Sequence, residues 1–268
     1  MTSTPPPTPV DAAGSVVQRP DLPQRPSTAL SVRGVTVRFG GNTAVDEVSF
    51  DAEAGCVTGL IGPNGAGKTT LFNVVCGLQR PNAGRVELAG HDVTRLPPYK
   101  RARRGLGRTF QRLELFGVLT AHGNVRVAAE LARHRRTDGA SPDEVADALL
   151  ERVGLAGMRD VRADQLPTGQ ARLVELARAL AAQPSVLLLD EPASGLDESE
   201  TRAFGELLRE LAGEGMAVVL VEHDVPLVLA VCDRVHVLDM GRVLAVGSAE
   251  EIRTDARVHD AYLGAVTA

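Results

Sequence analysis

The chain has 268 residues, of which 44% are hydrophobic and 24% charged, and its formal net charge is −5. These values are typical of a globular protein with a full core, and the negative charge argues against a broad nucleic-acid-binding surface. Apolar runs such as residues 218–221 have strand length, far below the roughly 18 residues of a transmembrane helix, and no basic start followed by an apolar run indicates a signal peptide. Any work at a membrane is therefore expected to proceed from the cytoplasmic face through a partner.

The chain is expected to begin with a tail and then to alternate strands and helices. Residues 1–28 are rich in Pro, Ser, Thr and Ala and lack a hydrophobic period, which predicts a flexible segment. The expected strands cover 30–39, 45–50, 56–61, 85–88, 186–189 and 217–221, and the expected helices cover about 68–76, 121–136, 142–153, 169–180 and 198–213. This alternation predicts a mostly parallel sheet covered by helices, and the segment 96–164 is interpreted as a helical insertion.

A glycine-rich loop joins the apolar strand 56–61 to the helix that follows. Residues 62–69 read Gly-Pro-Asn-Gly-Ala-Gly-Lys-Thr, which fits the phosphate-binding P-loop pattern in full. The glycines let successive backbone N–H groups converge on phosphate, while Lys68 is expected to reach the β- and γ-phosphates and Thr69 to offer its hydroxyl to Mg²⁺. The predicted nucleotide ligands are Gly62, Pro63, Asn64, Gly65, Ala66, Gly67, Lys68, Thr69 and Thr70.

The apolar strand 186–189 ends in two carboxylates, Asp190 and Glu191. A carboxylate at the carboxyl end of a parallel strand beside a P-loop can hold a metal ion through water, which assigns Asp190 to Mg²⁺. The adjacent Glu191 can polarise the attacking water as general base. Acidic residues at a strand end are often only solvated turn residues, but the neighbouring P-loop favours the catalytic interpretation.

With these motifs in place, the sequence resembles the nucleotide-binding subunits of ABC transporters over about residues 29–264. Gln111, in Arg-Thr-Phe-Gln, resembles the Q-loop glutamine, which in that family senses metal and water and faces the membrane partner. His223 resembles the switch histidine on the γ-phosphate, Phe39 matches the aromatic that stacks on adenine, and Ser-Gly-Leu-Asp at 194–197 resembles the D-loop. The resemblance implies Lys68, Gln111, Glu191 and His223 as catalytic residues, Phe39, Gln111 and His223 as further ATP ligands, and Thr69, Gln111 and Asp190 as Mg²⁺ ligands.

Residues 166–170, Leu-Pro-Thr-Gly-Gln, occupy the place of the family's signature Leu-Ser-Gly-Gly-Gln. In the family this loop closes over ATP held by the opposite subunit, which implies contacts in trans from Thr168, Gly169 and Gln170. Pro167 stands in the serine position and lacks both the hydroxyl and a backbone N–H. Thr168 can restore a hydroxyl at the neighbouring position.

The departure in the signature points to one branch of the family, because a Leu-Pro-aromatic-Gly-Gln variant is common among the LivG-like ATPases of branched-chain amino acid importers. Further likenesses to that branch are Arg-Phe-Gly-Gly at 38–41, Glu-His-Asp at 222–224 and Ala-Tyr-Leu-Gly at 261–264, within a C-terminal extension of about 241–268. Thr168 replaces the aromatic residue usual there, so the match is incomplete at that position.

The resemblance implies an α/β fold with a RecA-like P-loop ABC ATPase core, an N-terminal antiparallel β flank and an inserted helical subdomain at about 96–164. It implies ATP hydrolysis with Mg²⁺, a second ABC ATPase subunit formed by a different chain, two transmembrane permease subunits and, indirectly, a solute-binding protein. The alternatives are the ATPase of another ABC system, for urea or amide import or for lipid or lipopolysaccharide export, and a catalytically weak regulatory subunit. A third alternative is a soluble ABC protein of translation or DNA repair. Such a protein would need a second cassette or a long coiled coil, and this sequence shows neither pattern.

Two weaker features receive plain interpretations. The basic run Lys100, Arg101, Arg103, Arg104 and Arg108 is expected to be a solvated helix face rather than a lipid-binding patch. The cysteines at positions 56, 76 and 232 have no metal-ligand spacing and are expected to be small buried hydrophobic residues.

Overall fold

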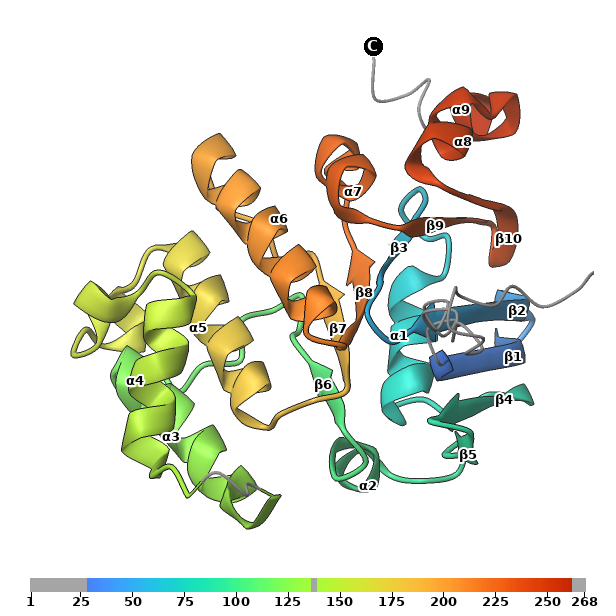
Figure 1. Cartoon of the computed structure of the whole chain (residues 1–268). Helices are drawn as coiled ribbons and strands as arrows, with labels where there is room; N and C mark the ends of the chain where they lie inside the picture. The colour runs from blue at the N-terminus through green and yellow to red at the C-terminus, as the bar shows by residue number, and fades with distance from the viewer. Residues whose placement is uncertain (1–27, 136–138, 262–268) are drawn as a thin grey trace, which may run out of the picture.

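The computed structural model describes residues 28–135 and 139–261, and its centre is a six-stranded sheet (Figure 1). The strands lie in the order β10 (Arg242–Gly247), β9 (Arg234–Asp239), β3 (Val57–Ile61), β8 (Ala217–Val221), β7 (Val186–Asp190) and β6 (Leu106–Arg108). Neighbours pair in parallel except β9 and β10, which are antiparallel. Every residue of β3, β7 and β8 is buried, as in strands covered on both faces, so the mostly parallel sheet is confirmed.

A four-stranded antiparallel sheet flanks this core and confirms the β flank expected near the N-terminus. Its strands lie in the order β2 (Asn42–Glu53), β1 (Thr28–Phe39), β4 (Ala83–Leu88) and β5 (His91–Asp92). Helix α1 (Lys68–Cys76) lies beside the flank in Figure 1, and its buried Leu71, Phe72 and Val75 join one apolar cluster with residues of both sheets. The P-loop helix is therefore held between two sheets.

Three helices pack on the other face of the parallel sheet: α5 (Thr168–Ala181), α6 (Glu198–Gly213) and α7 (Val225–Val231). Helix α6 shows why the sequence forms a helix here. The side chain of Asp197 accepts a hydrogen bond from the Glu200 amide at 2.8 Å, and the side chain of Glu200 returns to the Asp197 amide at 2.9 Å. The helix then buries Phe204, Leu208 and Leu211 against the sheet.

The helical part consists of α3 (Ala121–Ala132) and α4 (Pro142–Arg152), which pack on each other and on α5 at one side of the molecule in Figure 1. Three short 3₁₀ turns, Arg133–Arg135, Ala156–Met158 and Ala163–Gln165, complete it. The expected start at residue 96 falls too early, because β6 pairs with β7 in the parallel sheet and α2 (Pro98–Ala102) lies beside the end of α1. The sequence does not indicate β6, because a strand of three residues is too short to show a strand pattern. The predicted boundary therefore falls before it.

The ends of the described chain extend the sequence-based picture. Thr28, assigned to the tail, is the first residue of β1, and residues 1–27 lie outside the described ranges. After β8, the elements α7, β9 and β10, which sequence periodicity did not single out, lead into α8 (Ala249–Thr254) and α9 (Ala256–Ala261). Of the likeness at 261–264, only Ala261 lies within the described residues.

Arg101 corrects the interpretation of the basic run as a solvated face. The side chain of Arg101, on α2, is among the largest fully buried ones, and the residue is 1% exposed. Its guanidinium donates to the Val74 carbonyl at 2.6 Å and the Val75 carbonyl at 2.7 Å, two carbonyls of the last turn of α1. Further bonds go to Leu96 and Thr94 carbonyls at 3.0 and 2.8 Å. Arg101 thus anchors the end of the P-loop helix.

Over the described ranges, none of the helices combines the length and the apolar character that crossing a bilayer requires.

Candidate nucleotide site

The P-loop lies between the end of β3 and the start of α1, and its glycines are required by close backbone contacts. Gly62 has φ 144°, and a Cβ there would lie 2.0 Å from the Leu238 carbonyl oxygen. Gly67 has φ 101°, and a Cβ there would lie 2.4 Å from the Ala44 carbonyl oxygen. Only glycine fits either position. The loop is also bonded to the turn between β9 and β10, since the Gly241 amide donates to the Ala66 carbonyl at 3.1 Å.

A cavity of about 190 Å³ opens at this loop and collects most of the predicted site residues. It is lined by Ala44, Asn64, Gly65, Ala66, Gly67, Lys68, Thr69, Thr70, Gln111, Glu191 and His223. Phe39 is not among the lining residues and is 51% exposed at the end of β1. The structure therefore brings most of the predicted phosphate ligands together with Gln111, Glu191 and His223, while Phe39 is exposed outside the cavity.

Lys68 is buried and bonded to the loop itself. Its Nζ donates to the Gly62 carbonyl at 2.6 Å and to the Pro63 carbonyl at 3.0 Å. Burial lowers the pKa of Lys68, an effect opposed by the charges of Glu191 and Asp190. The ammonium is thus held at the phosphate position by two carbonyls that anionic oxygens can replace.

Asp190 ends β7 and is 1% exposed. Its Oδ2 accepts a hydrogen bond from Arg108 at 3.1 Å, while Oδ1 is buried and has no partner among the residues that the structure describes. Burial raises the pKa of Asp190, and the neighbouring Arg108 opposes that rise. Thr69 and Gln111 line the cavity, and Asp190 directly precedes its lining residue Glu191. A hydroxyl, an amide oxygen and a carboxylate oxygen without a partner are hard-oxygen donors, so these residues fit a magnesium ion.

Arg108 is a site residue that the sequence interpretation missed. It was assigned to a solvated basic face, yet its side chain is 8% exposed. Besides Asp190 it binds Asn73 Oδ1 at 2.8 Å, and its guanidinium lies 4.7 Å from the centre of the Phe110 ring. No local pattern distinguishes this arginine from its neighbours, because its partners lie far away in the sequence.

Glu191 is the point at which the other candidates meet. Its Oε1 accepts a hydrogen bond from Gln111 Nε2 at 3.1 Å and lies 2.7 Å from His223 Nε2. The backbone of Glu191 has φ 50°, a left-handed conformation that non-glycine residues seldom adopt outside functional turns. Two side chains from separate loops thus converge on one carboxylate oxygen of Glu191 beside the P-loop, which places a potential general base at the centre of the candidate site.

Glu222 supports this arrangement from the next strand end and was not predicted. It is 5% exposed, and its carboxylate accepts from the Ala193 amide at 2.8 Å and the His223 amide at 3.1 Å. Burial raises the pKa of Glu222, opposed by these backbone hydrogen bonds. It ties the loop after Glu191 to the loop that carries His223.

The signature residues lie apart from this cavity, at the start of α5. Pro167 is the N-cap residue, and no side chain caps the helix. Gly169 is packed against the D-loop of the same chain, since a Cβ there would lie 2.7 Å from the Gly195 carbonyl oxygen. Gln170 Oε1 is buried without a hydrogen-bond partner in the described part of the chain. Thr168, Gly169 and Gln170 therefore make no contribution to the cavity around Lys68.

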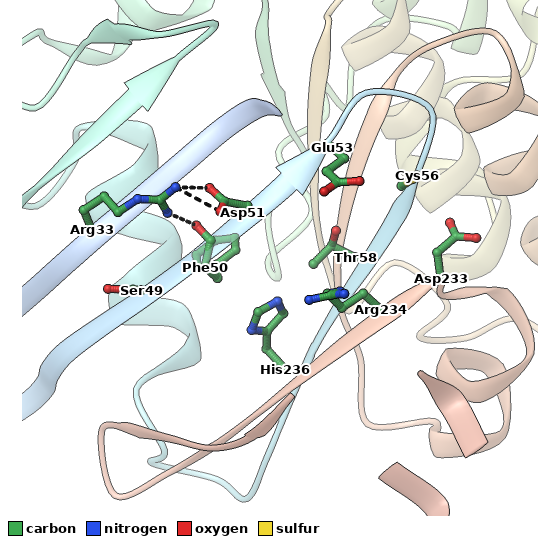
Figure 2. Close-up of a pocket in the computed structure, with 10 residues that line it drawn as sticks. All are labelled: Arg33, Ser49, Phe50, Asp51, Glu53, Cys56, Thr58, Asp233, Arg234 and His236. Atoms are coloured by element: carbon green, nitrogen blue, oxygen red, sulfur yellow. Dashed lines mark hydrogen bonds and ion pairs between the residues drawn. The ribbon is translucent and has the colours of Figure 1, made fainter. Parts of the chain in front are cut away.

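A second, larger cavity of about 420 Å³ lies at the opposite end of β3 (Figure 2). Figure 2 shows Arg33 joined to Asp51 on one wall and His236 reaching in from β9. Burial lowers the pKa of His236 to about 4, assisted by Arg234, and neither ring nitrogen has a partner among the described residues. This cavity has no glycine-rich loop and is separate from the phosphate site.

Comparison with known proteins agrees with this geometry. Residues 45–194 match the ABC transporter family model, and residues 242–268 match the model described as branched-chain amino acid ATP-binding cassette transporter. The chain is 39% identical over 249 residues to the high-affinity branched-chain amino acid transport ATP-binding protein LivG of Salmonella typhimurium, covering 88% of this chain and 97% of the relative. It is 40% identical over 250 residues to BraF of Pseudomonas aeruginosa, with the same coverage.

Solved structures place the fold in the same group. The ADP conformation of an ATP-binding cassette of an ABC transporter superposes with a TM-score of 0.78 at 28% identity, covering 88% of this chain and 99% of that one. The predicted RecA-like cassette fold is confirmed. The chain therefore belongs to the ABC transporter family, as one of its ATP-binding, ATP-hydrolysing subunits.

Proposed function

We propose that this subunit energises the import of branched-chain or related amino acids, working from the cytoplasmic face of the cell membrane through separate permease subunits. The observation that carries the assignment to hydrolysis is the meeting of Gln111 and His223 on Glu191 beside the P-loop. The match of residues 242–268 and the names of the LivG and BraF relatives support the cargo class.

In the proposed reaction Lys68 exchanges its two loop carbonyls for phosphate oxygens and stabilises charge that develops there. Glu191 accepts the proton of the attacking water, with His223 and Gln111 positioned by their bonds to its Oε1. Thr69, Gln111 and Asp190 are the residues that would hold Mg²⁺, which when bound neutralises charge on the β- and γ-phosphate oxygens. Phe39 would stack on adenine after a change of position or by closure of the site.

The signature residues Thr168, Gly169 and Gln170 act in trans in this proposal. Their separation from the cavity around Lys68 supports it, because the start of α5 remains free to meet nucleotide on another subunit. A cassette structure with a TM-score of 0.73 and 27% identity is described as a dimer in a post-hydrolysis state bound to ADP and Pi. The proposed partners are a second ABC ATPase of a different chain, two permeases and, indirectly, a solute-binding protein.

A second candidate function is lipopolysaccharide export. The chain is 34% identical over 235 residues to the LptB ATP-binding protein of the lipopolysaccharide export system of Haemophilus influenzae. The match of the C-terminal residues 242–268 to the branched-chain amino acid model favours import. Urea or amide import, and a weakly catalytic role caused by Pro167, are the further alternatives that the same experiment separates.

The test is deletion of the gene in its source organism, followed by uptake of labelled leucine, isoleucine, valine and urea. We expect loss of branched-chain uptake, restored by the wild-type gene and not by Glu191→Gln. Normal amino acid uptake in the deletion strain, with changed outer-membrane lipid, would contradict the import proposal. Full rescue by Glu191→Gln would contradict the catalytic assignment while leaving the cargo class in place.

A further inference from the structure

The segment from Phe110 to Phe116, which contains Gln111, has no regular secondary structure, and its backbone is bound by side chains of α5. The guanidinium of Arg172 donates to the Phe110 carbonyl at 2.6 Å and also to the Gln111 carbonyl. The carboxylate of Glu175 accepts from the Phe110 amide and from the Glu114 amide, each at 3.4 Å. The backbone groups of Phe110, Gln111 and Glu114 therefore find partners on α5, while those of Phe116 bond to Asn124 on α3.

The two side chains that bind this loop form a buried ion pair. Arg172 and Glu175 are 3.3 Å apart, and their side chains are 8% and 5% exposed. Burial raises the pKa of Glu175, an effect opposed first by the charge of Arg172. Burying a charged pair is costly unless its remaining hydrogen-bonding capacity is used. Here the loop backbone uses both terminal nitrogens of Arg172 and one oxygen of Glu175, while Arg172 Nε is buried without a partner in the described part of the chain. Arg178, one turn further along α5, adds a bond to the Glu114 carbonyl.

Gln111 is held at both of its ends. Its carbonyl is bound by Arg172 on α5, and its side-chain amide donates to Glu191 Oε1 at 3.1 Å. Helix α5 begins at the signature residue Thr168, one turn before Arg172. A continuous set of direct contacts thus runs from the start of α5 through Gln111 to Glu191.

We propose that Arg172 and Glu175 are positioning residues that attach Gln111 to the signature helix and so fix where its side-chain amide lies relative to Glu191. The role of Glu191 rests on the proposed function, whereas the attachment of the loop to α5 does not. In the described arrangement Oε1 of Glu191 is engaged by Gln111 and His223. Without the attachment, the Gln111 backbone would no longer be held by α5, and its side-chain amide would lose its fixed place at that oxygen.

The directions of the hydrogen bonds allow the attachment to be tested separately from the ion pair. Carbonyls need a donor at position 172, and amides need an acceptor at position 175, so exchanging the charges keeps an ion pair but inverts both hydrogen-bonding roles. Arg172→Lys keeps the charge but removes the two terminal guanidinium nitrogens that bind the two carbonyls. The variants are therefore Arg172→Lys, Arg172→Gln, Glu175→Gln and the double exchange Arg172→Glu with Glu175→Arg. Arg202→Gln, which breaks an exposed pair with Glu198 on α6, is the matched control.

The first measurement is hydrogen exchange of the full-length purified chain, which needs no transport partner. We expect the Phe110 and Glu114 amides to exchange about tenfold faster in Glu175→Gln, because the charged acceptor is replaced by a neutral and therefore weaker amide oxygen. Affinity for a non-hydrolysable ATP analogue should stay within about twofold of wild type, because the P-loop contacts remain. Unchanged exchange at both amides would overturn the attachment.

The second measurement is turnover in the assembled transporter. We expect the substitutions at 172 and 175 to lower kcat about 10- to 100-fold with little change in KM, and the double exchange not to recover it. Recovery by the double exchange would show that only the ion pair matters and would overturn the positioning role. A fall in thermal stability and ATP affinity parallel to that in kcat would mean a purely structural role, again against the proposal. The proposed role of Glu191 as general base is tested separately. Full activity of Glu191→Gln would contradict that role without affecting the attachment of the loop to α5.

Discussion

Helices α1 and α5 both begin without a side-chain cap, whereas the other described helices of seven or more residues begin with one. The capping residues are Thr120 for α3, Ser141 for α4, Asp197 for α6 and Asp224 for α7. An uncapped start leaves backbone N–H groups free for an anionic ligand. The two exceptions are the helices that follow the P-loop and the signature.

The two uncapped ends differ in what surrounds them. The start of α1 faces Gln111, Glu191 and His223 of the same chain, and Lys68 already occupies it. The start of α5 packs against the D-loop residues Gly195 and Leu196 and opens with Pro167, which has no N–H to offer. One end is a nearly complete site and the other a partial one, which is the division of residues that the proposed pairing with a second ATPase subunit predicts. The predictions below test this difference.

The largest expected effect is at the start of α1, where the site is nearly complete. Glu191→Gln keeps the shape of the side chain but removes the base, and turnover should fall by about 10²- to 10⁴-fold with ATP binding intact. Single-turnover hydrolysis in the assembled complex measures it, with the exposed Glu198→Gln as control. A rate within a few-fold of wild type would remove Glu191 from the role.

The next effect compares the two ends directly. If the partner ATPase has a standard signature, the site built from Lys68 and Glu191 meets an intact serine, while the other site meets Pro167. Loss of one donor to the γ-phosphate costs about 10²- to 10³-fold in rate, part of which Thr168 can recover. Disabling Glu191 should therefore remove most activity of the heterodimer, and disabling the partner's catalytic glutamate little. Equal losses would mean that Pro167 causes no asymmetry.

Lys68→Ala should weaken nucleotide binding by about 10- to 100-fold, because a charged hydrogen-bond donor at the phosphates is lost. A fluorescent ATP analogue measures the affinity. The chain offers a close control in Lys100→Ala, an exposed lysine on α2 that should leave binding unchanged. Unaltered affinity and turnover in Lys68→Ala would place the phosphate site elsewhere.

The smallest effect is expected outside both ends, at His236 in the second cavity. Its pKa falls from 6.5 to about 4 on folding, so its contribution to stability is present above pH 6.5 and is lost as the pH falls through 4. Between pH 7 and pH 5 the free energy of unfolding should therefore drop by about 2 kcal/mol more in wild type than in His236→Phe. Urea unfolding measures this, with the exposed His91→Gln as control. An identical pH dependence in both proteins would contradict the buried neutral state.

Sequence alone predicted the residues whose roles depend on local order along the chain. The P-loop, Asp190 and Glu191 follow apolar strands directly, and Gln111 and His223 belong to recognisable motifs. The structure was needed for residues whose partners are distant. Arg108 meets Asp190 across 82 positions, and the partners of Arg172 lie 61 and 62 positions away. Composition treats such arginines as surface charges, because a one-dimensional pattern contains no information about which distant carbonyl or carboxylate they will meet.

The same limit applies to short elements and to single side chains. The three-residue strand β6 has too few positions to show a period, so the helical insertion was expected to begin before it. Phe39 was recognised by its motif, but its 51% exposure depends on how the end of β1 is covered, which no local pattern determines.

The bond between Gly241 and the Ala66 carbonyl has a practical consequence. The family-specific C-terminal match begins at residue 242, one position beyond this contact, so the turn that touches the P-loop leads directly into the C-terminal part of the chain. Met240, beside the contact, is 85% exposed and has φ 44°. A fluorophore attached through Met240→Cys would therefore lie on the molecular surface one residue from the contact with the P-loop, where a change in its emission on adding ATP would report the filling of that loop.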